Sequence, residues 1–312
     1  MVASFESLLP VFLVIAAGFM IRRLAIVPAD QWRGIELAAF WVFFPALVAE
    51  TLLKADLASI PVTNVAFALL IGISAMALLM LGLRKPLMRL FALDGPAYTS
   101  IFQAVTRWNG FIALPIVAKL FGDPGVTIVA LALAAMIPII NMANISVLAI
   151  FASHTEPSFA MIAKTIIRNP LVWGTLVGLA LNLSGFKLYP PVMTALELMS
   201  GAALGLGLVM VGAGMRESEL LPISARVWAG TLMRLIGTPI VMGAIALALG
   251  LKGYAFVTIL ICAAVPTAMN GYILAKQMGG DAPYYATLVM VQTVLSLLTI
   301  PLIVWLAQTY GP

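Results

Sequence analysis

Two stretches place polar and helix-breaking residues inside otherwise apolar sequence: VTRWNGFIALPIV at 105–117 and PTAMNGYILA at 266–275. Each holds an Asn-Gly pair and a proline, namely Asn109, Gly110 and Pro115 in the first and Pro266, Asn270 and Gly271 in the second. A helix that breaks inside a membrane leaves backbone N–H and C=O groups that lipid cannot pair, so protein or a water-filled cavity must surround the break. Two breaks at matching places in two halves of a chain are typical of a transporter's binding site.

Two arginines, Arg107 and Arg234, also lie within apolar segments, where each costs roughly 2.5–3.5 kcal/mol on insertion scales. A guanidinium stays protonated and can hold a carboxylate through two hydrogen bonds, or it can serve as a fixed positive charge. The N-terminus of each half-helix adds free N–H groups and a partial positive charge. These features predict an anion site and disfavour an organic-cation substrate. The alternative is that each arginine only ties a helix to backbone carbonyls.

The other polar residues are assigned by their positions relative to the two breaks. The expected substrate contacts are Arg107, Asn109, Gly110, Thr267, Asn270 and Gly271, with Arg234 as a fixed charge beside them. Pro115 and Pro266 are expected to stop the helices from re-forming across the breaks. Glu197 is either half of a structural ion pair or a coupling site, whereas Asn141 and Asn144 are expected to form hydrogen bonds between helices.

The composition places the chain in a membrane. The 312 residues are 63% hydrophobic and 9% charged, with a mean hydropathy of +1.11, whereas soluble domains are roughly 25% charged. Apolar runs of about 20 residues favour helical spans over a transmembrane barrel. The net charge of +5 comes from residues in short loops, so it bears on topology and does not indicate nucleic-acid binding. With one cysteine and one histidine, we expect neither a metal site nor a cofactor.

The sequence predicts ten membrane spans, at 5–21, 35–53, 64–83, 97–120, 126–151, 170–185, 190–214, 227–250, 254–277 and 284–309. Eleven loop lysines and arginines follow odd-numbered spans, and four follow even-numbered spans. Positive residues collect in cytoplasmic loops. The odd-span loops are therefore expected in the cytoplasm and both termini in the periplasm.

Ten spans without a large extramembrane domain suggest two five-helix repeats of opposite orientation. The first repeat is expected at 1–151 and the second at 170–312, joined by a cytoplasmic linker at 152–169 that carries a short interfacial helix. Three features recur in the same order in both halves. These are a Leu-Gly-Leu triplet before the broken span, a Gly-Asp pair after the Asn-Gly pair, and a proline in the last span.

The order and spacing of five segments resemble the auxin efflux carrier family of bacterial transporters, relatives of the plant PIN carriers. The segments are FFPALVAETL at 43–52, NGFIALPIVAKLFG at 109–122, RNPLVWGTLVGLAL at 168–181, LGLVMVGAGM at 206–215 and AVPTAMNGYILAKQMGGD at 264–281. They extend over both halves of the chain. The long hydrophilic segment that separates the halves of the plant carriers is absent.

The resemblance implies an all-α fold similar to sodium/proton antiporters, with crossed broken helices at spans 4 and 9. It implies a scaffold of spans 1, 2, 6 and 7, a transport domain of spans 3–5 and 8–10, and homodimers formed through the scaffold. It also implies that Asn109 and Asn270 contact an anionic substrate, with malonate or malate as examples. Arg107 departs from the family pattern and favours a compact carboxylate.

We therefore expect a secondary transporter of a small organic anion in the bacterial inner membrane, working by elevator-type alternating access. Its partners would be a carboxylate substrate and the lipid bilayer. Carriage of auxin-like or bile-acid-like anions with proton or sodium coupling is the alternative within transport. A membrane enzyme is the alternative from another class, but the sequence holds no convergent acid, base or metal set.

Overall fold

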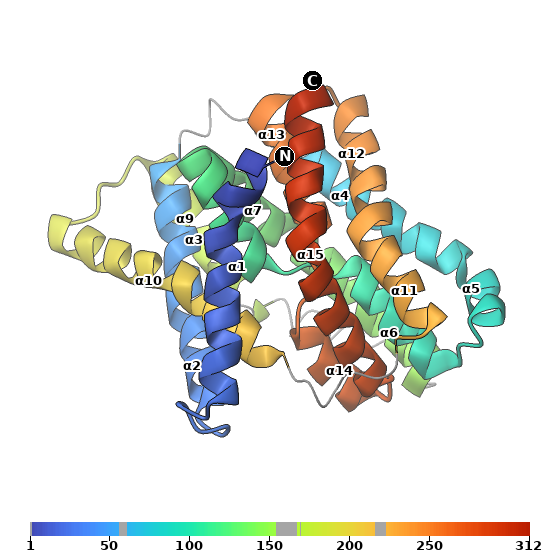
Figure 1. The fold of residues 1–312 in the computed structure, drawn as a ribbon. Coiled ribbons are helices and arrows are strands. Elements are labelled where there is room, and N and C mark those ends of the chain that lie inside the picture. The colour runs from blue at the N-terminus through green and yellow to red at the C-terminus, as the bar shows by residue number, and fades with distance from the viewer. Residues whose placement is uncertain (1, 56–60, 154–166, 169, 216–222) are drawn as a thin grey trace.

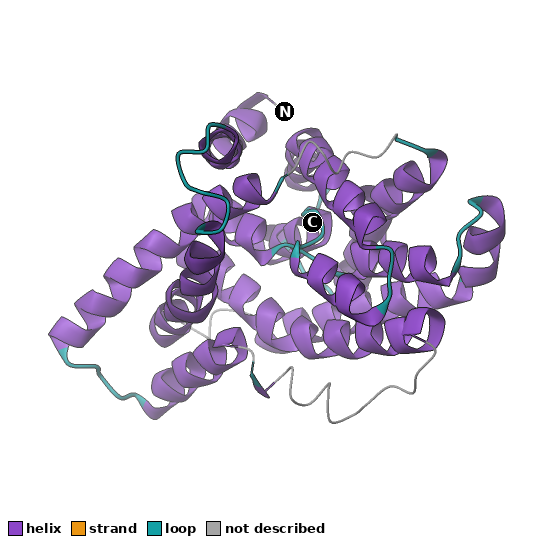
Figure 2. Cartoon of the chain, turned by 90° about the horizontal axis from the view of Figure 1, so that it is seen from below, coloured by secondary structure: helices purple, strands orange, loops and turns teal. Residues whose placement is uncertain are grey.

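The computed structural model describes residues 2–55, 61–153, 167–168, 170–215 and 223–312, and every regular element in this part of the chain is helical (Figures 1 and 2). The elements of the first half are α1 (Val2–Arg23), α2 (Trp32–Ala38), η1 (Ala39–Phe43), α3 (Phe44–Lys54), α4 (Val62–Gly82), α5 (Arg84–Leu90), α6 (Gly95–Thr106), α7 (Gly110–Leu148) and η2 (Ala149–Ser153). Those of the second half are α9 (Pro170–Ser184), α10 (Pro190–Gly214), α11 (Ala225–Leu232), η4 (Met233–Gly237), α12 (Thr238–Ala248), α13 (Gly253–Ala264), α14 (Asn270–Met278) and α15 (Ala282–Tyr310). The three η elements are π-helical turns.

Six helical segments of the described chain are long and apolar enough to cross a membrane, judged by length and composition. They are Trp32–Lys54, Val62–Gly82, Gly95–Ser153, Pro190–Gly214, Ala225–Ala248 and Ala282–Tyr310. Pro170–Ser184 and Gly253–Ala264 are shorter apolar helices. All ten ranges expected from the sequence contain helix, while the ten-span inverted repeat itself stays a prediction. The interfacial helix expected in the linker falls largely on residues 154–166, outside the described part.

One group of helices, at the left of Figure 1, contains α1, α2, α3, α9 and α10. Glycines let two helix pairs in this group approach closely, as small residues commonly do in membranes. On α1 and α10, a Cβ added to Gly18 would lie 2.2 Å from the Val209 carbonyl oxygen, and one added to Gly212 would lie 1.8 Å from that of Ile15. On α9, Gly178 fits in the same way against the Ala49 carbonyl of α3.

A second group contains α4, α5, α6 and the helices from α11 to α15, with α7 between the two groups. Asp94 and Asp281 accept backbone N–H bonds at the starts of α6 and α15, so both helices have side-chain N-caps. The Ser100 hydroxyl of α6 donates to the Asp281 carbonyl at 2.8 Å, and this hydrogen bond links the N-terminal ends of α6 and α15. Gly122, at φ +58°, turns the chain within α7 where a residue with a Cβ would be strained.

Candidate functional site

The first break in the helices separates α6 from α7 at Arg107–Asn109. Arg107 adopts an extended backbone with ψ 151° and ends α6. Asn109 then caps α7, because its side-chain Oδ1 accepts the Phe111 N–H at 3.0 Å. This cap uses the amide oxygen of Asn109 and leaves its Nδ2 group as a donor toward the space beside the break.

Arg107 is buried, with 6% of its surface exposed. Its Nε donates to the Gln103 side-chain oxygen at 3.3 Å. Its two Nη groups find no acceptor among the described residues. A buried charge without a partner is costly, and a bound anion is one way to compensate it. Arg107 therefore presents free guanidinium donors, as an anion site requires.

The second break separates α13 from α14 at 265–269. Two buried residues of α15 hold it in place. Gln292 accepts the Thr267 N–H at 3.0 Å, and the Tyr285 hydroxyl donates to the Ala268 carbonyl at 2.6 Å and lies 2.9 Å from the Thr267 hydroxyl. Unwound backbone inside a membrane must be satisfied by neighbouring protein groups, and α15 supplies those groups here. Asn270 then begins α14 with an exposed side chain.

Arg234 lies in the π-helical turn η4 and is 1% exposed. Its guanidinium donates to the carbonyl oxygens of Val265 at 2.8 Å, Val105 at 3.1 Å and Cys262 at 3.1 Å. Val105 belongs to the last turn of α6, Cys262 to the last turn of α13, and Val265 to the second break. A single side chain therefore joins the C-terminal ends of both broken helices.

Both breaks border one cavity of about 580 Å³, which lies between the two groups of helices. The residues from the breaks that line it are Arg107, Trp108, Asn109, Gly110, Ala268, Met269 and Asn270. Residues from α1, the segment before α2, α2, η1, α3, α9 and α10 form the facing wall. Three arginines (Arg22, Arg33, Arg107) and one glutamate (Glu36) line the cavity, which gives a formal charge of +2. The lining suits a negatively charged ligand.

The cavity also has a broad aromatic surface. Its aromatic residues are Trp32, Phe40, Trp41, Phe44, Trp108, Phe111 and Tyr272. Phe44 and Phe111 are in contact, with ring centroids 4.2 Å apart, so the first group of helices touches α7 beside the first break. Polar groups that fix orientation within a mainly apolar lining are typical of small-molecule sites.

The structure brings together four of the expected site residues, because Arg107, Asn109, Gly110 and Asn270 all line the cavity. Thr267, Gly271, Pro266 and Arg234 are buried next to the breaks and do not line it. The two prolines differ in placement. Pro266 lies in the second break, whereas Pro115 lies inside α7 beyond the first break.

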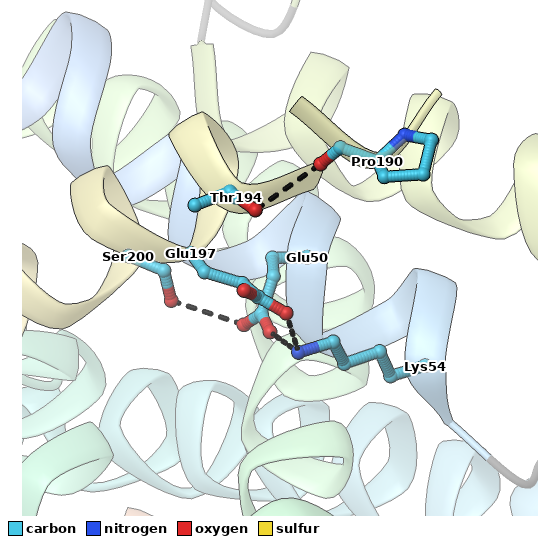
Figure 3. Close-up of polar contacts among 6 residues, drawn as sticks. All are labelled: Glu50, Lys54, Pro190, Thr194, Glu197 and Ser200. Atoms are coloured by element: carbon cyan, nitrogen blue, oxygen red, sulfur yellow. Dashed lines mark hydrogen bonds and ion pairs between the residues drawn. The ribbon is translucent and has the colours of Figure 1, made fainter. Parts of the chain in front are cut away.

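Glu197 lies apart from the cavity, on α10. It forms an ion pair of 2.7 Å with Lys54 of α3, which also pairs with Glu50 at 2.5 Å. Ser200 donates to the second oxygen of Glu50 at 3.0 Å (Figure 3). Glu197 is 45% exposed, so its pair with Lys54 is worth little by itself. Of the two roles considered for Glu197, this geometry matches the structural ion pair.

Several residues of the site were not expected from the sequence. Tyr285 and Gln292 brace the second break, and Thr106 exchanges hydrogen bonds of 3.2 Å with Asn144 of α7 beside the first. The interhelical role expected for Asn144 is confirmed, while Asn141 lines the cavity. One signal was available: both breaks read Thr-x-x-Asn-Gly, as TRWNG from 106 and TAMNG from 267.

Comparisons with known proteins bear on what this site does. A family model described as "Membrane transport protein" matches residues 154–304. An "Uncharacterized transporter" of Methanothermobacter thermautotrophicus is 24% identical over 303 residues, covering 96% of this chain and 97% of the relative. A "Putative malonate transporter" of Rhizobium meliloti is 24% identical over 328 residues, covering 96% of this chain and 95% of the relative. "Auxin efflux carrier component 6" of Arabidopsis thaliana is 26% identical over 143 residues, covering 44% of this chain and 25% of the plant protein.

Proposed function

We propose that this chain, which is similar in sequence to membrane transporters and to auxin efflux carriers, is a membrane transporter of a small organic anion. The substrate would be a mono- or dicarboxylate such as malonate or malate. The observation that carries the proposal is the unpartnered guanidinium of Arg107 in the cavity that borders both helix breaks. The relative named for malonate aligns over nearly its whole length, which supports this substrate class. Because the relatives are named transporters and carriers, an enzymatic function has no support.

Binding would use the groups that the breaks leave unpaired. The Nη groups of Arg107 would hold a carboxylate with two charge-assisted hydrogen bonds. The side-chain amides of Asn109 and Asn270 would donate from either side, and the N–H of Gly110 would contribute at the start of α7. The partial positive charges at the N-termini of α7 and α14 would add to the attraction.

The arrangement of the helices supports alternating access of the elevator type. The first group of helices would be the scaffold, and α4–α7 with α11–α15 would be the transport domain. The cavity walls come from both groups, so a relative movement of the groups would change the cavity's access. The cavity extends to Arg22, Arg33 and Gly214, all at loops expected on the cytoplasmic side. The structure would then correspond to an inward-facing state, with both termini in the periplasm.

A larger aromatic anion is the second candidate substrate. The aromatic wall opposite Arg107 favours it, because indole and phenyl rings of the cavity could stack on an aromatic ligand. Proton or sodium coupling finds less support at this site. The carboxylate among the described cavity residues is Glu36, which is exposed and pairs with Arg33 at 3.1 Å. Competition of malonate uptake by indole-3-acetate would separate the two substrate classes.

A dimer through the scaffold is a further part of the proposal. Gly201 and Gly205 of α10 are exposed, have open space where a Cβ would lie, and form the GxxxG spacing that lets membrane helices pack closely. Light scattering of the detergent-solubilised protein should give the mass of two chains. Gly201→Leu should shift it to one chain, and an unchanged dimer in this variant would exclude this face.

The transport proposal is tested by uptake of labelled malonate into proteoliposomes. Arg107→Ala should lower uptake by about tenfold or more, since lost charged hydrogen bonds cost roughly 1.5–3 kcal/mol each. Arg89→Ala, at an exposed position of α5, is the matched control and should leave uptake unchanged. Asn109→Asp should preserve the α7 cap, because Asp and Asn cap equally well, while it removes the donor and adds a repelling charge. Unchanged uptake in both Arg107→Ala and Asn109→Asp would refute the site.

A further inference from the structure

Three backbone carbonyl oxygens converge on the guanidinium of Arg234. They belong to Val105, Cys262 and Val265, at distances between 2.8 and 3.1 Å. Two of them are in the last turns of α6 and α13, where helix carbonyls have no intrahelical partner. Without Arg234, these oxygens would be buried polar groups in an apolar region, a costly arrangement.

The same atoms have the character of a cation site. Each helix C-terminus carries a partial negative charge of roughly half an electron, and α6 and α13 both end here. In membrane transporters, half-helix C-termini and unwound carbonyls are the groups that coordinate sodium ions. Arg234 supplies a positive charge at this point, and its three hydrogen bonds go to backbone carbonyls. The charge of the guanidinium is therefore balanced by backbone dipoles.

We propose that Arg234 is a resident cation, covalently attached to the protein, in a cation-binding site formed by the carbonyls of Val105, Cys262 and Val265. Removal of its charge leaves a site that a free monovalent cation fills. The wild-type protein consequently needs no bound ion to hold the crossing of the broken helices together. A test of this inference by transport rests on the proposed function, whereas a test by protein stability does not.

The two buried arginines differ in a way that makes this inference specific. Arg107 has one side-chain hydrogen bond and faces the cavity, so its role depends on a ligand. Arg234 has three backbone partners and does not line the cavity. The Val105 carbonyl that Arg234 holds is two residues before Arg107 in the chain. Arg234 is thus a positioning residue that fixes the end of α6, on which the substrate site is built.

The test uses three substitutions of Arg234 and thermal unfolding of the purified full-length protein. Arg234→Lys keeps the charge, Arg234→Gln keeps hydrogen-bond donors without the charge, and Arg234→Ala removes both. We expect Arg234→Gln and Arg234→Ala to unfold at lower temperature than the wild type in choline chloride. Millimolar guanidinium, or sodium, should raise their unfolding temperatures, whereas the wild type and Arg234→Lys should show no such cation dependence. Arg89→Ala and Arg107→Ala are matched controls and should also show none.

Uptake in the same variants gives a second readout. Arg234→Gln should lose about tenfold or more of the malonate uptake rate in choline chloride, and guanidinium or sodium should restore it. If Arg234→Gln matches the wild type in choline chloride, the charge is not needed and the inference is overturned. If Arg234→Gln is destabilised and no small cation stabilises it, the carbonyls do not form a cation site. If Arg234→Ala does not fold, the unfolding temperatures of Arg234→Gln and Arg234→Lys are sufficient to decide the inference. A wild type that fails to carry malonate would refute the substrate, while the stability results would still decide the inference.

Discussion

The two Asn-Gly pairs differ in what surrounds their glycines, and this difference gives a sharp prediction. A Cβ added to Gly271 would lie 2.3 Å from the Tyr285 hydroxyl oxygen and 2.4 Å from the ring carbon Cζ. An ordinary contact begins at 3.4 Å, so ring and helix must separate by about 1 Å. Tyr285 is fully buried and its hydroxyl is hydrogen-bonded, so the ring cannot move freely. Gly271→Ala should therefore distort the start of α14.

The expected cost combines three terms. Overpacking of a buried site costs about 1–3 kcal/mol, and a disturbed Tyr285 hydrogen bond adds about 0.5–1.5 kcal/mol. The gain in helix propensity from glycine to alanine offsets at most about 1 kcal/mol. We expect Gly271→Ala to lower the free energy of unfolding by about 0.5–4.5 kcal/mol and to weaken substrate binding through displacement of Asn270.

Gly110→Ala is the matched control, because its Cβ would meet only the flexible end of Leu133 at 3.1 Å. Its stability should change by less than about 1 kcal/mol. Thermal unfolding in detergent measures both variants. The Gly271→Ala defect should diminish when Tyr285→Leu removes the ring, which a double-mutant cycle would detect. Equal effects of the two alanine substitutions, or no coupling to position 285, would refute this account of the crossing.

The positions of the breaks could be predicted because a membrane makes polar residues and helix breakers conspicuous. Arg107 and the two Asn-Gly pairs are costly in lipid unless they face protein or water. That reasoning placed Arg107, Asn109 and Asn270 at one site, and the structure finds all three on one cavity wall. Apolar length likewise gave the helical ranges, since spans are read from composition alone.

The alternative considered for Arg234, a side chain that ties helices to backbone carbonyls, matches the structure. Which carbonyls it binds could not be predicted, because backbone carbonyls are the same at every residue and leave no mark in the sequence. Tyr285 and Gln292 were missed for a related reason. They lie in α15, where they are two among several polar residues, such as Tyr284 and Thr293, and no helix break marks them. For Pro115 the sequence predicted more than the structure shows. A proline removes one N–H bond, but α7 continues through it, so the residue type did not fix where the helix ends.

Two further predictions concern packing and the second break. Gly212→Ala should destabilise the protein by about 2 kcal/mol or more, because its Cβ would lie 1.8 Å from the backbone oxygen of Ile15. Gly82→Ala is the control and should not destabilise the protein, because there is open space where its Cβ would lie. Thermal unfolding measures both variants. Tyr285→Phe keeps the ring and removes the hydroxyl that binds the Ala268 carbonyl. The unpaired carbonyl should cost about 1–3 kcal/mol. Because residues 268–270 line the cavity, substrate affinity should fall as well. An affinity equal to that of the wild type would show that α15 does not position this wall.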